Sequence, residues 1–307
     1  MNDSEKPVLT SSQWKLIIMI LSLTAFSVGY RLIAMHHLEQ TSLMFIGLPA
    51  LLAVILAVTP KAKSTIGGIM RGITLALLLS GVLLGEGFIC IVMAAPLFYM
   101  VGGIVGALVD WDRRRSRNPA RSLVLLLLLP MSVEGVSPVM SFGRGESVQV
   151  SQVVDAPAAA VEQTLAEVPR TDVGLPFYLR MGFPRPAWAT GSGLDVGAMR
   201  TIHFAGGEGH PGDLVLRVEE SRPGYVRYAA VSDHSKIAHW LAWRTSEIAW
   251  APVDAQHTRV TWTLDFERKL DPAWYFGPWE RYAARLAAQG LIRANATPPA
   301  MNGRPRE

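Results

Sequence analysis

The sequence is short of the residues on which disulfides and metal clusters depend. Its 307 residues include one cysteine, Cys90, which stands inside an apolar run. One cysteine excludes an internal disulfide and a cysteine-based metal cluster. Charged residues are also scarce, at 18% of the chain, and no glycine-rich loop of the phosphate-binding kind is present. We therefore expect no cofactor and no metal.

The small net charge of +4 is confined to one half of the chain. Residues 1–143 hold 11 Lys and Arg against 7 Asp and Glu, whereas residues 144–307 hold 18 of each kind. A nucleic-acid-binding domain would carry a basic excess. We therefore predict no nucleic-acid partner and attribute the positive charge of the first half to membrane topology.

The first half consists mainly of apolar runs. A helix needs about 20 apolar residues to cross the hydrocarbon core of a bilayer. Five runs approach that length, at residues 14–35, 41–59, 66–84, 88–110 and 121–142. The fifth is strongly apolar only to Met131 and then contains Glu134. The sequence predicts an all-α transmembrane domain of four to five helices, embedded in the membrane over residues 1–143.

Loop charges predict the orientation of these helices. Cationic loops resist translocation, so Lys61, Lys63 and the arginine-rich segment 110–121 are expected on the cytoplasmic side. If the fifth run crosses the membrane, the residues after 143 are extracytoplasmic; if it only lies at the interface, they are cytoplasmic. We favour crossing, and expect an integral protein of the plasma (inner) membrane with an extracytoplasmic C-terminal domain.

Glycines four apart recur in the apolar runs, as at Gly68 and Gly72 and at Gly102 and Gly106. Such spacing lets helix backbones approach closely and leaves a helix-mediated oligomer open. Glu86 is interpreted as a solvated turn residue. With no series of intramembrane acids and bases, an ion-coupled transporter is poorly supported.

The second half has the alternating pattern of an antiparallel sheet with one wet face. Apolar and polar residues alternate in runs at 148–154, 198–205, 213–220, 225–233, 242–251 and 258–268, joined by short connections. One helix is expected from Asp155 to about Val168, and a long amphipathic helix from Pro272 to Ala296. The tail 299–307 lacks apolar periodicity and is expected to be disordered.

Pairing each hairpin symmetrically about its loop assigns one face of the sheet to the interior. That face collects Ile202, Phe204, Leu214, Leu216, Ala229, Val231, Ser246, Leu264 and Phe266, together with Arg200, Arg227 and Arg244. A single bulge would invert a strand. The terminal helix is the expected cover, with Trp279, Tyr282 and Leu286 facing Trp262, Leu264 and Phe266.

The order of these elements resembles a known superfamily. The residues that carry the resemblance are Asp-Ala-Pro-Ala-Ala-Ala-Val at 155–161, Gly-x-x-Arg at Gly197–Arg200 and Thr-Arg-Val-Thr-Trp-Thr at 258–263, followed by the long terminal helix. They are similar to the START-like, polyketide-cyclase/dehydrase and lipid-transport (SRPBCC) superfamily over residues 146–298. The resemblance implies an α+β helix-grip fold, a curved antiparallel sheet around a long C-terminal helix, and between them an elongated cavity for a hydrophobic ligand.

The residues expected to line that cavity come from the inner face and from the terminal helix. They are Arg200, Ile202, Phe204, Leu216, Arg227, Arg244, Ile248, Trp250, Trp262, Leu264, Phe266, Trp279, Tyr282 and Leu286. A charge buried alone is costly, so inward arginines need partners. Two alternatives are open: ion pairs with Asp or Glu at the rim, or an anchor for a carboxylate or phosphate on an otherwise apolar ligand.

Other polar groups are discounted. Adjacent residues rarely reach the geometry of a catalytic triad, so Asp233-His234-Ser235 is interpreted as a loop. His36, His37 and Glu39 are too few and too unsupported for a metal site. His210 lies in a turn rich in glycine and proline and is no strong acid or base.

The sequence leaves three functions open. The first is a non-enzymatic, membrane-anchored module, with a START-like domain over 144–298, that binds or transfers a lipid or other hydrophobic small molecule. The second is a cyclase- or hydratase-type enzyme on a hydrophobic substrate, with His203, Tyr228 or an acidic pocket residue as acid or base. The third is a membrane sensor or structural protein that the pocket regulates. We take the first as the main hypothesis.

Overall fold

The structure is a computed structural model that describes the chain in segments. These are residues 14, 16–22, 51, 62, 64–83, 88–114, 134, 141–172, 174–180, 182–205 and 211–298. They belong to two compact units, residues 1–132 and 133–307. The tail 299–307, the run 41–59 apart from Leu51, and most of the run 121–142 lie outside the described residues.

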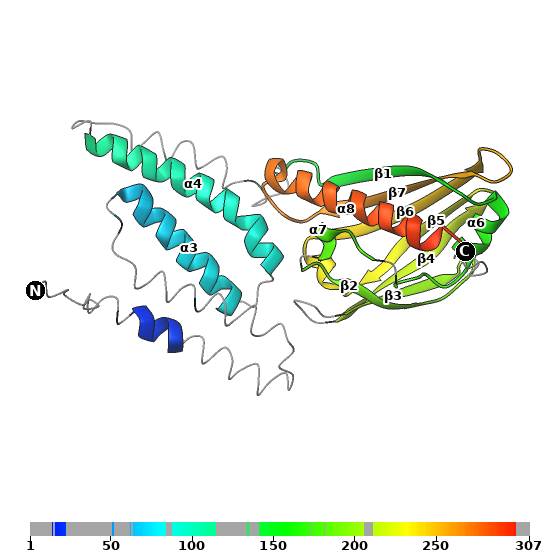
Figure 1. Cartoon of the computed structure of the whole chain (residues 1–307), viewed down its shortest axis with the longest axis horizontal. Helices are drawn as coiled ribbons and strands as arrows, with labels where there is room; N and C mark the ends of the chain where they lie inside the picture. The colour runs from blue at the N-terminus through cyan, green and yellow to red at the C-terminus, as the bar shows by residue number, and fades with distance from the viewer. Residues whose placement is uncertain are drawn as a thin grey trace, which may run out of the picture. The chain divides into compact units, whose positions relative to one another are not determined.

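Two long helices, α3 (Thr65–Leu83) and α4 (Phe88–Arg114), form most of the described part of the first unit (Figure 1). They approach closely where α4 carries two glycines. A Cβ atom added to Gly102 would lie 2.2 Å from Cδ1 of Ile73, and one added to Gly106 would lie 2.9 Å from Cα of Ile66. Because no side chain fits there, the glycine spacing serves close packing between α3 and α4.

Polar contacts tie the same two helices together. The hydroxyl groups of Thr74 and Tyr99 are 2.7 Å apart. The amide of Ile66, in the first turn of α3, donates to the carboxylate of Asp110 at 3.4 Å. The carboxylate thus satisfies one of the amides that have no partner within the helix.

One described helix, Cys90–Trp111, is long and apolar enough to cross a membrane, with a mean hydropathy of 2.1. α3 is apolar only over Thr65–Ser80, which is shorter than a span requires. Among the described residues, this one helix supports the prediction of four to five membrane helices, and the others are not supported. The support from this helix rests on its length and composition. Most of the runs 14–35, 41–59 and 121–142 lies outside the described residues, so these three spans stay predictions.

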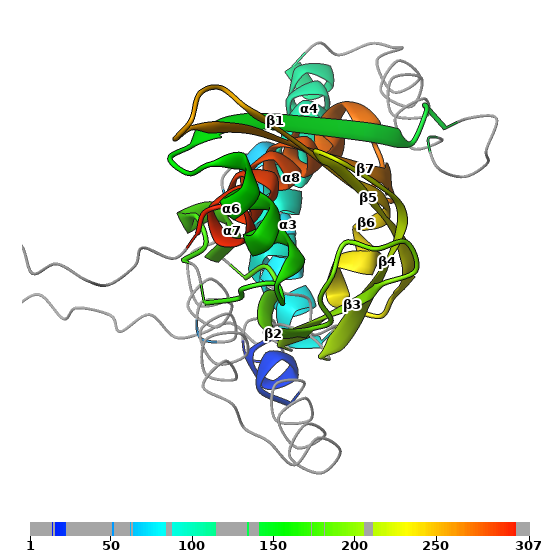
Figure 2. The same ribbon diagram turned by 90° about the vertical axis from the view of Figure 1, so that its right-hand side faces the viewer.

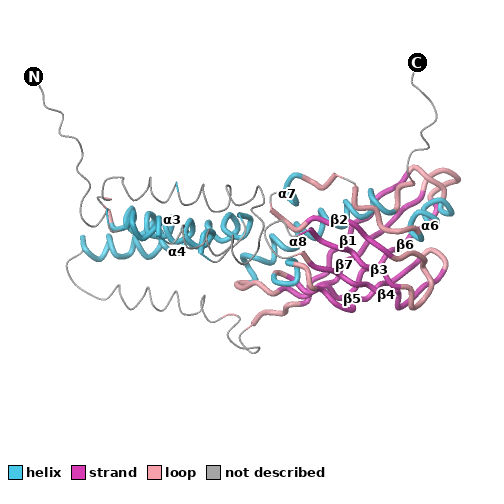
Figure 3. Tube along the Cα trace, turned by 90° about the horizontal axis from the view of Figure 1, so that it is seen from below, coloured by secondary structure: helices cyan, strands magenta, loops and turns pink. Residues whose placement is uncertain are grey.

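The second unit is built on one seven-stranded antiparallel sheet. The strands are β1 (Gly145–Val154), β2 (Arg185–Thr190), β3 (Met199–Ala205), β4 (Gly212–Arg222), β5 (Tyr225–Asp233), β6 (Leu241–Pro252) and β7 (Thr258–Arg268). The described helices are α6 (Ala158–Ala166), α7 (Phe177–Arg180) and α8 (Ala273–Asn295), with a 3-10 turn at Lys236–His239. The strand order is β1-β7-β6-β5-β4-β3-β2. The sheet curls around α8 (Figure 2), which is the expected helix-grip arrangement. Figure 3 shows the strands of this unit and its helices α6, α7 and α8 from below.

The regular alternation of β7 fixes the inner face of this sheet. Val260, Trp262, Leu264 and Phe266 are all buried, and β7 pairs with β1 on one side and β6 on the other. Burying a large apolar side chain stabilises a fold by about 1.5–3 kcal/mol. The main core forms here, where α6 and the end of α8 pack on the inner face.

Bulges give β5 the opposite face to the one expected. The register between β4 and β5 shifts twice. A one-residue shift turns every following side chain to the other face. As a result Val226 and Tyr228 are buried and Ala230 pairs with Leu216, whereas Val231, predicted to point inward with Ala229, is 52% exposed.

α8 meets the sheet through small side chains. Its buried stripe contains Gly277, Glu280, Ala284, Ala288 and Ile292, which recur at helical spacing. Glycine and alanine let the helix lie close to β1 and β7, where aromatic rings would hold it away. Trp279 and Tyr282, which were expected to face the apolar residues of β7, are 37% and 49% exposed, so the expectation was wrong for them. Leu286 is half-buried, and its predicted contact with β7 stays a prediction.

We predict that Gly106→Ile separates α3 from α4, because the new side chain would overlap the backbone of Ile66. Overpacking of this kind costs about 1–3 kcal/mol. The purified full-length chain should show a lower midpoint of thermal unfolding for its helical unit. Gly72→Ile is the control, since a Cβ atom there meets nothing within 4 Å; equal losses in the two variants would contradict the proposed packing.

Candidate ligand-binding site

The inner face of the sheet is covered unevenly. Val218 and Ile248, which belong to the core cluster that α6 and α8 complete, are almost fully buried. Ile202, Phe204 and Leu216 also belong to the inner face, but they are only half-buried. The sheet therefore keeps an apolar inner surface, toward β3, that the helices do not cover fully.

Arg200 is the predicted inward arginine that does lie inside, with 5% exposure. Its guanidinium donates to the carbonyl oxygens of Leu165 and Gly193 and lies 4.9 Å from the centroid of the Tyr228 ring. Burial lowers the pKa of Arg200 and raises the pKa of Tyr228. Among the described residues, neither Nε of Arg200 nor the hydroxyl of Tyr228 has a hydrogen-bond partner.

Arg227 and Arg244 lie on the outer face, which corrects their predicted place in the interior. Arg227 forms an ion pair with Glu247, with 3.5 Å between Nε and Oε1, and Arg244 pairs with Glu267. The bulges between β4 and β5 turn Arg227 outward, and a third bulge, in β6, turns Arg244 outward. Of the two alternatives for the inward arginines, pairing with an acidic residue applies to Arg227 and Arg244.

Trp243 takes the inward place that was predicted for Arg244. Its ring packs edge-on against Phe266, with 5.9 Å between the ring centroids. Its Nε1 is buried and has no partner among the described residues, whereas Nε1 of Trp262 donates to Ser246 at 2.8 Å. Sequence reasoning missed Trp243 because only the β6 bulge brings it inside.

Trp279 and Tyr282 belong to an aromatic cluster that α8 shares with α7. The Tyr178 ring is stacked 6.5 Å from the Trp279 ring and meets the Tyr282 ring edge-on at 5.2 Å. Phe183 continues the cluster, 5.3 Å from Tyr178 and 5.4 Å from Trp240. The helix α7 and strand β2 were missed because prolines made this segment look like loop.

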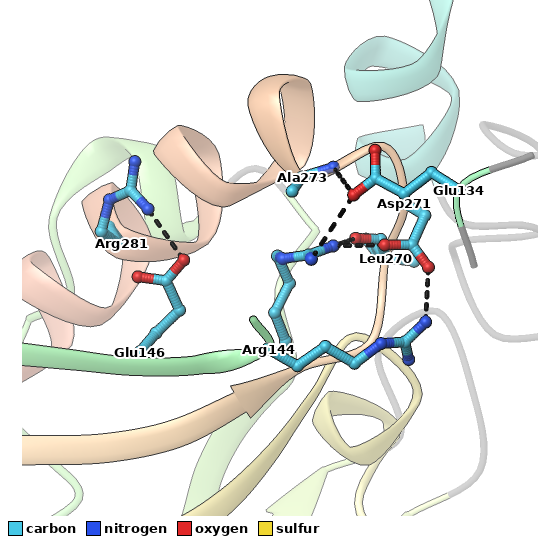
Figure 4. Close-up of polar contacts among 8 residues, drawn as sticks. Glu134, Arg144, Glu146, Leu270, Asp271, Ala273 and Arg281 are labelled. Carbon is cyan, nitrogen blue, oxygen red and sulfur yellow. Dashed lines mark hydrogen bonds and ion pairs between the residues drawn. The ribbon is translucent and has the colours of Figure 1, made fainter. Parts of the chain in front are cut away.

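A polar cluster surrounds the start of α8. Arg268, the last inward residue of β7, is completely buried and donates to Asp271 at 2.5 Å and to the carbonyl of Leu270. Its Nη2 lies 3.8 Å from Oε1 of Glu134. The same Glu134 oxygen accepts the amide of Ala273 at 2.9 Å, which caps the first turn of α8 (Figure 4).

Two more arginines extend this cluster along β1. Arg144 donates to Asp271 at 2.6 Å, and Arg281 of α8 donates to Glu146 at 2.8 Å (Figure 4). Glu134, read from the sequence as the polar end of a fifth membrane run, is instead part of the second unit. No local pattern predicts that Glu134 binds Arg268 and Ala273, because these partners lie more than a hundred residues away in the sequence.

Glu280 is a buried acid on the sheet side of α8, with 4% exposure. Burial raises its pKa to about 8, while the charge of Arg268 and the amide of Leu270 partly oppose the rise and the charges of Glu146 and Asp271 add to it. The Leu270 amide does not reach hydrogen-bonding geometry, since neither Glu280 oxygen has a partner among the described residues. The raised pKa favours the neutral carboxyl group at neutral pH.

The remaining polar candidates do not reach the interior. His203 faces outward as expected; it contacts Asp213 at 2.6 Å and stacks on Trp188 with 4.6 Å between the rings. Asp233 accepts the amide of Ser235, as in an ordinary turn. The described residues contain no cluster of three His, Cys, Asp or Glu that could hold a metal; His36, His37, Glu39 and His210 lie outside them.

We predict that Glu280 makes the folded domain less stable as pH rises. Its pKa in the folded state is about 8, above the ordinary value of 4.5, so its contribution to stability is complete below about pH 4.5 and is lost as pH rises through about 8. Glu280→Gln should flatten the fall of the unfolding midpoint in the full-length chain between about pH 5 and about pH 9. Glu162→Gln, at an exposed position of α6, is the control, and an unchanged slope in Glu280→Gln would contradict the assignment.

Comparison with known proteins gives a likeness of fold alone. No family model and no curated protein matches the chain. Among solved structures, the Zhui aromatase/cyclase from Streptomyces sp. R1128 is 17% identical, with a TM-score of 0.30 over 48% of this chain and 85% of that one. A START superfamily protein from Mycobacterium smegmatis is 12% identical, with a TM-score of 0.32 over 48% of this chain and 97% of that one.

A third solved structure is norcoclaurine synthase from Thalictrum flavum, at 13% identity and a TM-score of 0.30, over 47% of this chain and 86% of that one. At such scores these structures say nothing of ligand or reaction. Each match covers about half of this chain. By their titles the three are an aromatase/cyclase, a START superfamily protein and norcoclaurine synthase.

Proposed function

We propose that residues 133–298 bind a hydrophobic small molecule or lipid between the sheet and α8, and that the chain holds this domain at a membrane. The observation that carries the proposal is the uneven cover of the inner face. Ile202, Phe204 and Leu216 point inward but stay half-buried, whereas the neighbouring core is almost fully closed. Apolar surface left incompletely covered inside a curved sheet suits an apolar ligand, since binding would remove it from water.

Three unpartnered donors refine the class of ligand. Nε of Arg200, the hydroxyl of Tyr228 and Nε1 of Trp243 all belong to the inner face, and each is buried without a partner among the described residues. An unsatisfied buried polar group costs about 1–3 kcal/mol. A ligand that carries hydrogen-bond acceptors on an apolar body would relieve that cost. Arg200 already bonds two carbonyl groups, so a fully charged headgroup is not required.

The membrane part of the proposal rests on α4. The segment Cys90–Trp111 has the length and hydropathy of a membrane-crossing helix, and little of it is buried. A tether would raise the local concentration of the domain beside membrane-dissolved ligand, which favours uptake without new contacts. We retain the plasma membrane and the extracytoplasmic side of the domain as parts of this proposal.

The contacts of His203 and Tyr228 reduce the number of residues that could act as acid or base in the enzyme alternative. His203 lies on the outer face beside Asp213 and Trp188, away from the proposed ligand. Tyr228 lies inside, and burial raises its pKa, so its hydroxyl keeps its proton. A cyclase or hydratase would use Tyr228 as the acid that donates to a substrate oxygen.

Filling the interior should prevent binding. Ala230→Trp places a ring on the inner face beside Leu216, and the ligand mass that copurifies with the full-length chain should fall by about tenfold or more in native mass spectrometry, the result of losing about 1.4 kcal/mol. Ala249→Trp makes the same exchange at an exposed position of β6 and should keep its ligand. A wild-type chain that carries no apolar ligand, or equal occupancy in both variants, would overturn the proposal.

Tyr228→Phe separates the carrier from the enzyme. A carrier loses one hydrogen bond of about 1 kcal/mol, so its ligand should bind about fivefold more weakly and keep the same mass. An enzyme should instead accumulate a different molecule, such as one that differs by the elements of water. Tyr225→Phe, at the β4–β5 turn, is the matched control and should change neither mass nor occupancy.

A further inference from the structure

Aromatic rings stand in water along α7 and the solvent side of α8. Phe177 is 70% exposed, Trp274 and Tyr282 are each 49% exposed, and Trp279 is 37% exposed. Tyr178 joins the two helices by its contacts with Trp279 and Tyr282. We call the exposed residues of the two helices, which are labelled in Figure 1, the α7–α8 surface. Several exposed rings on two neighbouring helices are typical of an interaction site.

The charges on the α7–α8 surface are of one sign. The two helices contain a single acid, Glu280, and it is buried on the sheet side of α8. Their exposed cations are Arg180, Arg281, Arg285 and Arg293. Arg281 pairs with Glu146, but no ion pair joins Arg180, Arg285 or Arg293 to a carboxylate among the described residues. The solvent side of both helices is therefore aromatic and cationic.

This chemistry fits the headgroup layer of an anionic membrane. Tryptophan and tyrosine rings favour the boundary between hydrocarbon and water. Each arginine near an anionic surface adds about 1 kcal/mol of attraction. We propose that the α7–α8 surface docks on an anionic bilayer, with Phe177, Trp274 and Tyr282 in the headgroup layer and Arg180 and Arg285 on lipid phosphates.

The inference rests on the proposed function in placing the chain at a membrane, and it adds which face of the domain touches the lipid. α8 carries the docking residues on one side and the Gly277–Ala284–Ala288 stripe against the sheet on the other. The membrane and the ligand-binding interior would then share one helix. A lipid could pass between them without crossing the outer face of the sheet.

Spin labels on the full-length chain test the proposal. In a Cys90→Ser background, Phe177→Cys is labelled and the chain is reconstituted into vesicles of phosphatidylcholine, with or without phosphatidylglycerol. In phosphatidylglycerol vesicles the label should collide more with lipid-soluble oxygen than with a water-soluble nickel chelate. Ala249→Cys, on the exposed side of β6, is the control and should stay accessible to the chelate.

Two charge changes test the arginines. Arg180→Gln with Arg285→Gln should return the Phe177→Cys label to water, with about a tenfold or greater loss of the docked population. High salt should act in the same direction. A Phe177→Cys label as accessible as Ala249→Cys in both vesicles would overturn the proposal. So would a protected label that depends on protein concentration and not on phosphatidylglycerol, since its cover would be a second copy of the chain.

Other measurements on the same samples separate this inference from the proposed function. Native mass spectrometry reports the ligand, and extraction at alkaline pH reports whether the chain is embedded. If the chain is embedded and carries ligand but the label at Phe177→Cys stays accessible to the chelate, docking is contradicted and the proposed function is not. If the label is protected by lipid but no ligand copurifies with the chain, ligand binding is contradicted and docking is not.

Discussion

A guanidinium buried where the last strand meets the last helix holds the second unit together at that end. Arg268 follows Phe266 on the inward side of β7, so the alternation of the strand places its charge where water does not reach. A buried charge is tolerated only with opposite charges and acceptors around it. Asp271, the carbonyl of Leu270 and Glu134 supply them. The turn after β7 and the first turn of α8 are thereby fixed by one electrostatic requirement.

Much of the fold could be predicted from local pattern, but faces changed by bulges could not. β7 alternates without interruption, so its inner face followed from its residues alone. In β5 both alternations contain apolar residues, Val226 and Tyr228 on one side and Ala229 and Val231 on the other, so the sequence does not mark the bulges that choose between them. Arg227 was assigned to the interior for this reason, and Arg244 because the sequence does not mark the bulge in β6 either. On α8, the large aromatic rings were expected to pack on the sheet. The helix lies too close to the sheet for rings, so glycine and alanine occupy the packed face.

The residues of the candidate site also fall into those that local pattern predicts and those that it does not. Ile202, Phe204, Leu216 and Arg200 could be predicted because β3 and β4 pair without interruption from Met199 to Phe204. The unpartnered Trp243 and the buried acid Glu280 could not, since both depend on tertiary contacts. The outcome is an interior with a closed end under α6 and a less covered region toward β3. An apolar body with a few acceptors suits that interior better than a strongly ionic one, because Arg200 already has partners.

The position of Glu134 also has a mechanical side. Its carboxylate bonds to the amide of Ala273, whereas the neighbouring strand β1 is hydrogen-bonded to β7 along its whole length. A tensile load on the chain before residue 134 therefore reaches the first turn of α8 and Arg268, at the end of β7, through one carboxylate before it reaches the β1–β7 ladder. The contacts of this carboxylate with Ala273 and Arg268 therefore take the load first, at the end of the helix that covers the interior.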